Sequence, residues 1–415
     1  MEKHATAGSV MLPGKSSSLT APPAADSGQW APDLVSFSSL PLYQGNKVEL
    51  LIDGPATYRK MLDSIRDARE FIFLETYIFA DDEVGRKFAS ALKEKREHGL
   101  TVAIIYDSVG SIGSNGSFFD DLARAGIRIV QYNSINPLRG KLSRLNNRGH
   151  RKLLIVDRRI AFTGGINLSE TYSSSSSAGS GHDPLRDGWR DTQIAVTGAA
   201  VAGFLESFVN RWSRITGESL PVGEPQRSGR AGTETVGIVT ATGGQGRRSA
   251  IVGAYEAAIQ SANERIWITQ AYFAPARGFV NKLRKAAKRG VDVRIIVPGI
   301  TDSPLVRHAS RSWYGTLLKK RVRIYECTNA LLHAKTAVID GVWSTVGTSN
   351  LDYRSFLHND EINAVILGRA FGARMEEQFT KDMKNCRVMD LRTWRRRPLL
   401  DKLIERLSRS LEYWL

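Results

Sequence analysis

Cysteine, long apolar runs and clustered aromatic residues are all scarce in this chain of 415 residues. The two cysteines, Cys327 and Cys386, are too few for a disulfide framework or a cysteine-based metal site, so we expect two reduced, buried thiols. No apolar run reaches the roughly 18 residues needed to span a bilayer, so any membrane contact is expected from the side. We expect no metal and no cofactor, because no acidic metal-binding cluster is evident.

Positive charge, in contrast, is abundant. Lysine and arginine number 58 against 42 acidic residues, a net charge of +16. Such an excess favours partners that carry phosphate, either nucleic acid or an anionic membrane surface. Aromatic residues make up 8% and form no clustered stacking platform, which counts against nucleic acid. Residues 1–40 are rich in Ser, Ala, Gly and Pro and have no apolar core of signal-peptide length, so we interpret them as a disordered leader.

The chain repeats itself. Residues 68–108 read AREFIFLETYIFADDEVGRKFASALKEKREHGLTVAIIYDS, and residues 263–303 read NERIWITQAYFAPARGFVNKLRKAAKRGVDVRIIVPGITDS. Each segment has a β-prone apolar run, an amphipathic basic helix, a glycine and a second β-prone run, which predicts a β-α-β unit with parallel strands. Gly99 and Gly290 fall where a helix ends with positive φ.

Each unit is followed by a second shared block, HRKLLIVDRRIAFTGGIN from His150 and HAKTAVIDGVWSTVGTSN from His333. The repetition predicts an α/β fold of two related domains with pseudo-twofold symmetry and one active site at their interface. We expect the first domain over 41–225, a linker over 226–245 and the second domain over 246–390.

The shared block is expected to form a hairpin. His150 and Lys152 are two residues apart, so they project from one face of a strand. A two-residue turn at 158–159 would place Asn167 opposite His150. The corresponding residues of the second block are His333, Lys335 and Asn350.

This set of side chains suits a phosphodiester. One imidazole can attack phosphorus and form a phosphohistidine, while the other protonates the leaving alkoxide and later deprotonates the acceptor. The lysines and asparagines can neutralise and orient the non-bridging oxygens. A carboxylate that holds the other ring nitrogen strengthens a nucleophilic histidine, and the candidates are Asp191 in the first copy and Glu361 in the second.

The pattern His-x-Lys-x4-Asp-x6-Gly-x2-Asn occurs in both blocks and resembles the duplicated motif of the phospholipase D superfamily. The resemblance covers about 41–390 and implies two phospholipase D-like domains. It also adds the motif aspartates Asp157 and Asp340 to the catalytic set. Their position at strand ends favours a structural role instead, in which each caps a turn.

Within the superfamily the chain is similar to bacterial cardiolipin synthases of the short type, through FLETYIFADDEVG, RGHRKLLIVDRRIAFTGGINL and HAKTAVIDG…VGTSNLDYRS. That resemblance implies transfer of a phosphatidyl group between two phosphatidylglycerol molecules, with His150 as nucleophile and His333 as acid and base. Hydrolysis of phospholipids is the alternative, and a nuclease is a weaker one. Where many superfamily members have Ser, this chain has Gly165.

The C-terminal segment 391–415 is basic, and its leucines recur at helical spacing. We expect an interfacial amphipathic helix that binds an anionic membrane, with Trp394 and Trp414 at the headgroup level. The protein is then expected to be peripheral on the cytoplasmic face of the cell membrane, with phospholipid substrates and no nucleic-acid partner.

Overall fold

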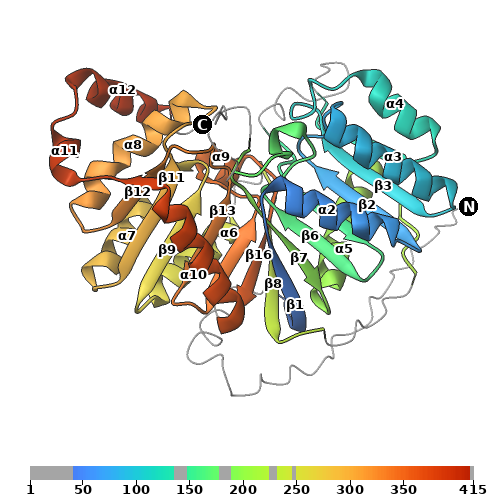
Figure 1. The fold of residues 1–415 in the computed structure, drawn as a ribbon, viewed down its shortest axis with the longest axis horizontal. Coiled ribbons are helices and arrows are strands. Elements are labelled where there is room, and N and C mark those ends of the chain that lie inside the picture. Colours follow the sequence, from blue (N-terminus) through green and yellow to red (C-terminus); the bar gives the residue numbers. More distant parts are fainter. Residues whose placement is uncertain (1–40, 135–146, 177–187, 224–230, 245–248, 412–415) are drawn as a thin grey trace, which may run out of the picture.

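A computed structural model describes residues 41–134, 147–176, 188–223, 231–244 and 249–411 (Figure 1). The expected leader over 1–40 and Trp414 lie outside these residues. Within the described ranges, no helix is long and apolar enough to cross a bilayer.

Strands and helices alternate along the chain. The strands are β1 (Leu42–Ile52), β2 (Phe71–Thr76), β3 (Thr101–Asp107), β4 (Arg128–Tyr132), β5 (Leu153–Val156), β6 (Ile160–Gly164), β7 (Thr192–Thr197), β8 (Glu234–Ala241), β9 (Arg265–Gln270), β10 (Phe273–Ala274), β11 (Asp292–Pro298), β12 (Arg323–Cys327), β13 (Lys335–Ile339), β14 (Trp343–Gly347), β15 (Leu351–Asp352), β16 (Glu361–Leu367) and β17 (Cys386–Val388). The helices are α2 (Asp53–Arg66), α3 (Glu83–Glu97), α4 (Gly116–Arg124), the short 3-10 turn η2 (Glu170–Tyr172), α5 (Ala200–Thr216), α6 (Ala250–Ser261), α7 (Arg277–Lys288), α8 (Pro304–Leu318), α9 (Tyr353–Leu357), α10 (Arg369–Lys384), α11 (Leu391–Arg395) and α12 (Leu399–Ser410).

The larger sheet has a palindromic order. It runs β17-β12-β11-β9-β13-β14-β16-β8-β1-β7-β6-β5-β2-β3-β4, so the two halves repeat outward from the antiparallel pair of β1 and β8. Within each half the predicted β-α-β unit supplies a parallel pair, β2 with β3 and β9 with β11. The predicted fold of two related α/β halves with pseudo-twofold symmetry is confirmed.

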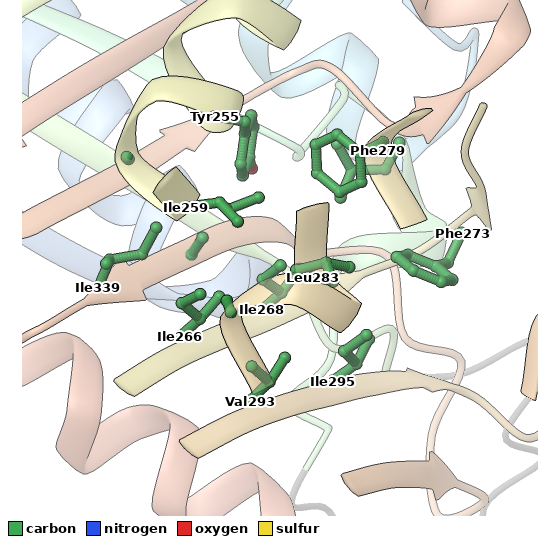
Figure 2. Packing of buried hydrophobic residues seen from close by; sticks show 14 of the residues in the cluster. Tyr255, Ile259, Ile266, Ile268, Phe273, Phe279, Leu283, Val293, Ile295 and Ile339 are labelled. Carbon is green, nitrogen blue, oxygen red and sulfur yellow. The ribbon is translucent and has the colours of Figure 1, made fainter. Parts of the chain in front are cut away.

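Helices cover both faces of the sheet (Figure 1). On one face, α6, α7 and α8 pack on the second half, and Figure 2 shows Leu283 and Phe279 of α7 above Ile266 and Ile268 of β9. On the other face, α5 and α10 contribute to a core that includes strands from both halves. The halves are therefore joined by a shared sheet and by a shared hydrophobic core.

The structure confirms one of the local predictions made from the repeats and corrects another. Gly99 and Gly290 follow α3 and α7 with φ of 89° and 99°, as predicted. The prediction of a two-residue hairpin turn is wrong, because Val156 pairs with Ile160 and leaves three residues in the turn. The first turn residue in each copy is an aspartate with φ of 51°, and this extra residue shifts the pairing by one position.

Two further expectations differ from the structure. Strand β8 lies inside the segment that we interpreted as a linker, where the Gly- and Thr-rich composition concealed the alternating run ETVGIVTA. The prediction of two reduced thiols is wrong, because Cys327 and Cys386 form a disulfide. They face each other on β12 and β17 at the edge of the sheet, a pairing that requires knowledge of the strand order.

Candidate active site

The two motif histidines lie where the halves meet. His150 precedes β5 and His333 precedes β13, and both side chains are almost fully buried. Each is anchored to the opposite half through its backbone: His150 N donates to Asp360 O at 3.0 Å, and His333 N donates to Arg190 O at 2.8 Å. The pseudo-twofold symmetry therefore brings two histidines that are far apart in the sequence into one site.

Each histidine is held by a carboxylate from the other half. Nδ1 of His150 lies 3.0 Å from both carboxylate oxygens of Glu361, and Nδ1 of His333 lies 2.7 Å from Asp191 Oδ2. The structure thus brings together the four residues that we selected from the sequence. The crossing of the pairs was not predicted, because the sequence identified one carboxylate in each copy without assigning it to a histidine.

Glu361 and Asp191 are supported in different ways. Glu361 accepts hydrogen bonds from Thr348, Ser355 and Asn359 as well as facing His150. In the first copy, Gly165 takes the place of Thr348, and a Cβ atom there would lie 2.1 Å from Asp191 Oδ1. The glycine that departs from the superfamily pattern therefore leaves room for the Asp191 carboxylate.

The two motif lysines are buried beside the histidines. Nζ of Lys152 donates to His150 O at 2.9 Å, and Nζ of Lys335 lies 2.9 Å from Nδ1 of His333. Burial lowers the pKa of Lys152 to about 7, with the charge of Lys335 adding to the shift, and burial lowers the pKa of Lys335 to about 8. Two ammonium groups with little access to water create strong positive potential at this point.

The same environment favours neutral imidazoles. Burial, followed by the charges of Lys152 and Lys335, holds the pKa of His150 well below its usual value. Burial and Lys335 also lower the pKa of His333, against the opposing effect of Asp191. Burial raises the pKa of Glu361 to about 8, although Lys152 and its hydroxyl donors act in the other direction. An ionised Glu361 that accepts the Nδ1 hydrogen leaves the Nε2 lone pair of His150 free to react.

The motif asparagines lie close to this group. Asn167 Oδ1 accepts from Ile78 N at 3.1 Å, and its Nδ2 donates to Tyr172 Oη at 3.1 Å. Asn350 is buried, and its Oδ1 has no hydrogen-bond partner among the described residues. Their predicted role in orienting phosphate oxygens stays a prediction, and the hydrogen bonds of Asn167 also fit a role in positioning Tyr172.

The motif aspartates lie at the far ends of β5 and β13, away from the histidines. Asp157 accepts hydrogen bonds from the backbone N–H groups of Arg69, Glu70 and Phe71. Asp340 does the same for residues 263–265. These contacts support the structural interpretation, in which each aspartate joins the hairpin turn to the start of a neighbouring strand. A catalytic role for either is only implied by the resemblance.

The sequence analysis missed Tyr172 and Ser355. Tyr172 Oη lies 3.3 Å from His333 Nδ1, and Ser355 Oγ donates to Glu361 Oε1 at 2.9 Å. Their spacing in the sequence could have identified them, since each lies five residues after its motif asparagine. Because one is a tyrosine and the other a serine, the shared position did not stand out.

Two α/β repeats that bring paired His-x-Lys motifs into one site define a member of the phospholipase D superfamily. The family model for the cardiolipin synthase PLD-like domain matches residues 61–176 and 255–383. The cardiolipin synthase of Geobacillus sp. (strain WCH70) is 33% identical over 374 residues, which is 89% of this chain and 73% of the relative. The cardiolipin synthase of Halalkalibacterium halodurans is 33% identical over 375 residues, again 89% of this chain and 73% of the relative. The chain belongs to the cardiolipin synthase family of PLD-like proteins.

Solved structures agree on the fold. Phosphatidylserine synthase from Haemophilus influenzae Rd KW20 matches with a TM-score of 0.70 at 14% identity, over 92% of this chain and 99% of that chain. Polyphosphate kinase from Porphyromonas gingivalis matches with a TM-score of 0.57 at 15% identity, over 88% of this chain and 53% of that chain. At these identities the similarity shows a common architecture.

Proposed function

We propose that this protein is a cardiolipin synthase that moves a phosphatidyl group from one phosphatidylglycerol to another and releases glycerol. The observation that carries the proposal is the pair of imidazoles, each held at Nδ1 by a carboxylate from the opposite half, beside two buried lysines. The named relatives of the family supply the substrate class.

In the first step, Nε2 of His150 attacks the phosphorus of the donor phosphatidylglycerol. Because Glu361 accepts the Nδ1 hydrogen of His150, the lone pair is on Nε2. The phosphorus–oxygen bond to the glycerol headgroup breaks, and His333 donates a proton to the departing oxygen. The Asp191 carboxylate favours the protonated His333 that this step requires, against burial and Lys335, which lower its pKa. This step leaves a phosphatidyl group bound to His150 and free glycerol.

In the second step, the now neutral His333 takes the proton from a hydroxyl of the second phosphatidylglycerol. The oxygen of that hydroxyl attacks the phosphorus, the phosphorus–nitrogen bond breaks, and cardiolipin leaves while His150 is regenerated. We assign Lys152 and Lys335 the role of neutralising the non-bridging oxygens in both transition states.

Incubation with phosphatidylglycerol vesicles and analysis of the lipids by mass spectrometry tests this function. We expect cardiolipin and glycerol from the unmodified protein and neither from His150→Ala. With phosphorus-labelled donor, we expect a labelled protein that is stable to base and labile to acid, as a phosphohistidine is, and no label on His150→Ala. Phosphatidic acid in place of cardiolipin would make the protein a hydrolase and overturn the proposal.

We also infer that the C-terminal segment binds an anionic membrane surface, which would give the site access to lipid at the cytoplasmic face. Helix α12 packs on α8 with a polar face, and its Glu405 is buried in ion pairs with Arg397 and Arg311. Its apolar face is turned outward, with Leu400, Leu403 and Leu407 being 65%, 54% and 58% exposed. An outward apolar face suits insertion at the headgroup boundary.

Trp394 does not belong to this apolar face. The prediction that it lies at the headgroup level is wrong, because it is 3% exposed and packs against Tyr314 with ring centroids 4.9 Å apart. The neighbouring arginines of α11 remain candidates for contact with anionic headgroups, at about 1 kcal/mol for each charge near the surface.

Flotation with phosphatidylglycerol vesicles tests the membrane proposal. We expect the double change Leu403→Glu and Leu407→Glu to lower vesicle binding at least about tenfold, because two inserted apolar side chains become charged. Val388→Glu is a matched control, since Val388 is 61% exposed on β17 and lies outside the helix. Equal binding by the double variant and the control would contradict the proposal.

A further inference from the structure

The active site is symmetric in its histidines and asymmetric in the charges around two tyrosines. Tyr77 and Tyr272 occupy matching positions in the two repeats. The ring of Tyr77 lies 5.2 Å from that of His150, and the ring of Tyr272 lies 6.5 Å from that of His333. The charges around each tyrosine therefore describe the environment of one histidine.

Several positively charged side chains surround Tyr77. Lys152 Nζ lies 5.3 Å from the centre of its ring. Burial and then the charge of Asp107 raise the pKa of Tyr77, and the charges of Arg354 and Arg148 act in the other direction. Two carboxylates lie on this side: Glu361, which faces His150, and Asp107, which is 1% exposed and accepts from three backbone N–H groups, including Gly149 N at 2.8 Å. This side of the site is suited to the negative charge of a phosphate.

Around Tyr272 the sign is reversed. Tyr272 Oη donates to the carboxylate of Asp302, with both oxygens at 2.8 Å, and Asp302 is exposed. Burial and then the charge of Asp302 raise the pKa of Tyr272. Burial lowers the pKa of Lys335, and the charges of Asp191, Glu361 and then Asp302 act in the other direction. An ionised carboxylate at this place repels phosphate, so the group it accepts must carry hydrogen-bond donors.

A donor group lies close to the same tyrosine. A small pocket beside Tyr272 is lined by Thr301 and Arg307, and Thr301 Oγ1 lies 3.4 Å from Asp302 Oδ1. Arg307 Nε is buried and has no hydrogen-bond partner among the described residues. A vicinal diol matches both kinds of group, because one hydroxyl can donate to a carboxylate while another accepts from a guanidinium.

We propose that Asp302, oriented by Tyr272 beside His333, is the specificity-determining residue for the alcohol and selects a glycerol headgroup through its vicinal diol. This inference rests on the proposed function, in which His333 protonates the leaving glycerol and deprotonates the hydroxyl of the acceptor. Both alcohols then occupy the half that contains Asp302, and the phosphate occupies the half that contains Tyr77. A cationic headgroup fits less well, because it would lie beside the ammonium group of Lys335.

Competition between two water-soluble acceptors tests the proposal. Phosphatidylglycerol vesicles are incubated with the full-length protein and equal concentrations of isotope-labelled glycerol and 1-propanol, which lacks the vicinal diol. The measured quantity is the ratio of labelled phosphatidylglycerol to phosphatidylpropanol. We expect Asp302→Asn to lower this ratio about tenfold and to leave the yield of phosphatidylpropanol within about twofold. Asparagine keeps an oxygen that can accept from Tyr272, so the tyrosine stays in place.

Two other variants complete the design. Asp121→Asn removes the same charge from an exposed position on α4 and should leave the ratio unchanged. Asp302→Ser should lower the ratio in the same direction, and it replaces Asp302→Asn if that variant does not fold. An unchanged ratio, or an equal loss of both products, overturns the inference. In a parallel incubation, ethanolamine replaces glycerol as the competitor of 1-propanol. A selective loss of ethanolamine incorporation by Asp302→Asn also overturns the inference, because the carboxylate would then recognise an ammonium group. If the unmodified protein transfers to no alcohol, the proposed function fails and the inference fails with it.

Discussion

Replacing Glu361 with glutamine removes one negative charge from beside His150 and leaves the size of the side chain nearly unchanged. Both carboxylate oxygens lie 3.0 Å from Nδ1 of His150. The amide of glutamine can turn its N–H2 group toward that nitrogen, so the imidazole proton moves to Nε2. A histidine in this tautomer has no lone pair on Nε2 for attack on phosphorus, because its lone pair is on Nδ1 and faces the glutamine. We therefore expect Glu361→Gln to lose the step that forms the covalent intermediate.

The surroundings of Glu361 determine the size of the effect. Thr348, Ser355 and Asn359 all donate to the carboxylate, so the amide oxygen has ready partners and the N–H2 group is left facing the histidine. Glu361 is fully buried, so water cannot readily substitute for the lost acceptor. The wrong tautomer in a comparable histidine–carboxylate pair costs about 10⁴-fold in turnover. We expect a loss of about 10³-fold to 10⁴-fold, or roughly 4 to 5.5 kcal/mol in the barrier.

Single-turnover release of glycerol from phosphatidylglycerol vesicles measures this step. Asp191→Asn is the matched variant, because it makes the same change beside His333. We expect Asp191→Asn to slow transfer but still to form labelled phosphohistidine, whereas Glu361→Gln forms none. A rate for Glu361→Gln within tenfold of the unmodified protein would refute the reasoning.

Three further results are expected. Glu361 must be ionised, and with a pKa of about 8 its ionised fraction grows as the pH rises. Lys152 must be protonated, and with a pKa of about 7 its protonated fraction grows as the pH falls. His333 must also be protonated in the first step, and burial and Lys335 lower its pKa, which moves the fall in rate to lower pH. The transfer rate should therefore follow a bell-shaped pH profile, and a rate that rises steadily to pH 10 would contradict this. Gly165→Ala should lower transfer at least about 100-fold with an unchanged circular dichroism spectrum, because its Cβ would lie 2.1 Å from Asp191 Oδ1. Leu283→Ala should lower the free energy of unfolding by about 2–5 kcal/mol in urea denaturation, because Leu283 is fully buried in the second-half core, and a loss below about 1 kcal/mol would be inconsistent with that packing.

The repeated pattern made most of the fold predictable. Two matching β-α-β units require parallel strand pairs, and β2 with β3 and β9 with β11 supply them. The glycines after α3 and α7 could be placed because only a residue that tolerates positive φ ends a helix in this way. The strand β8 escaped prediction because its edges are Gly- and Thr-rich and its partners, β1 and β16, lie far away in the sequence.

Which residues form the site could be predicted from the sequence, but which of them contact one another could not. His150 and His333 stood out because the same spacing of functional groups occurs twice. That His150 contacts Glu361 depends on the backbone bond from His150 N to Asp360 O, and this bond exists only once the halves have packed. The one-residue error in the hairpin turn had a local origin, since the positive φ of Asp157 is not visible in its β-prone neighbours.

The crossing of the carboxylates explains why a duplicated chain behaves as one enzyme. If each half supplied both a histidine and its own carboxylate, each could hold a complete reactive pair and the two would be independent. Because Glu361 faces His150 and Asp191 faces His333, neither half alone contains a histidine in the reactive tautomer. The continuous sheet through β1 and β8 fixes the distance between the halves, and the differences at Gly165 and Thr348 let the two pairs diverge. Symmetry therefore builds the site, and local departures from symmetry make the surroundings of the two histidines different, as the proposed division into nucleophile and acid and base requires.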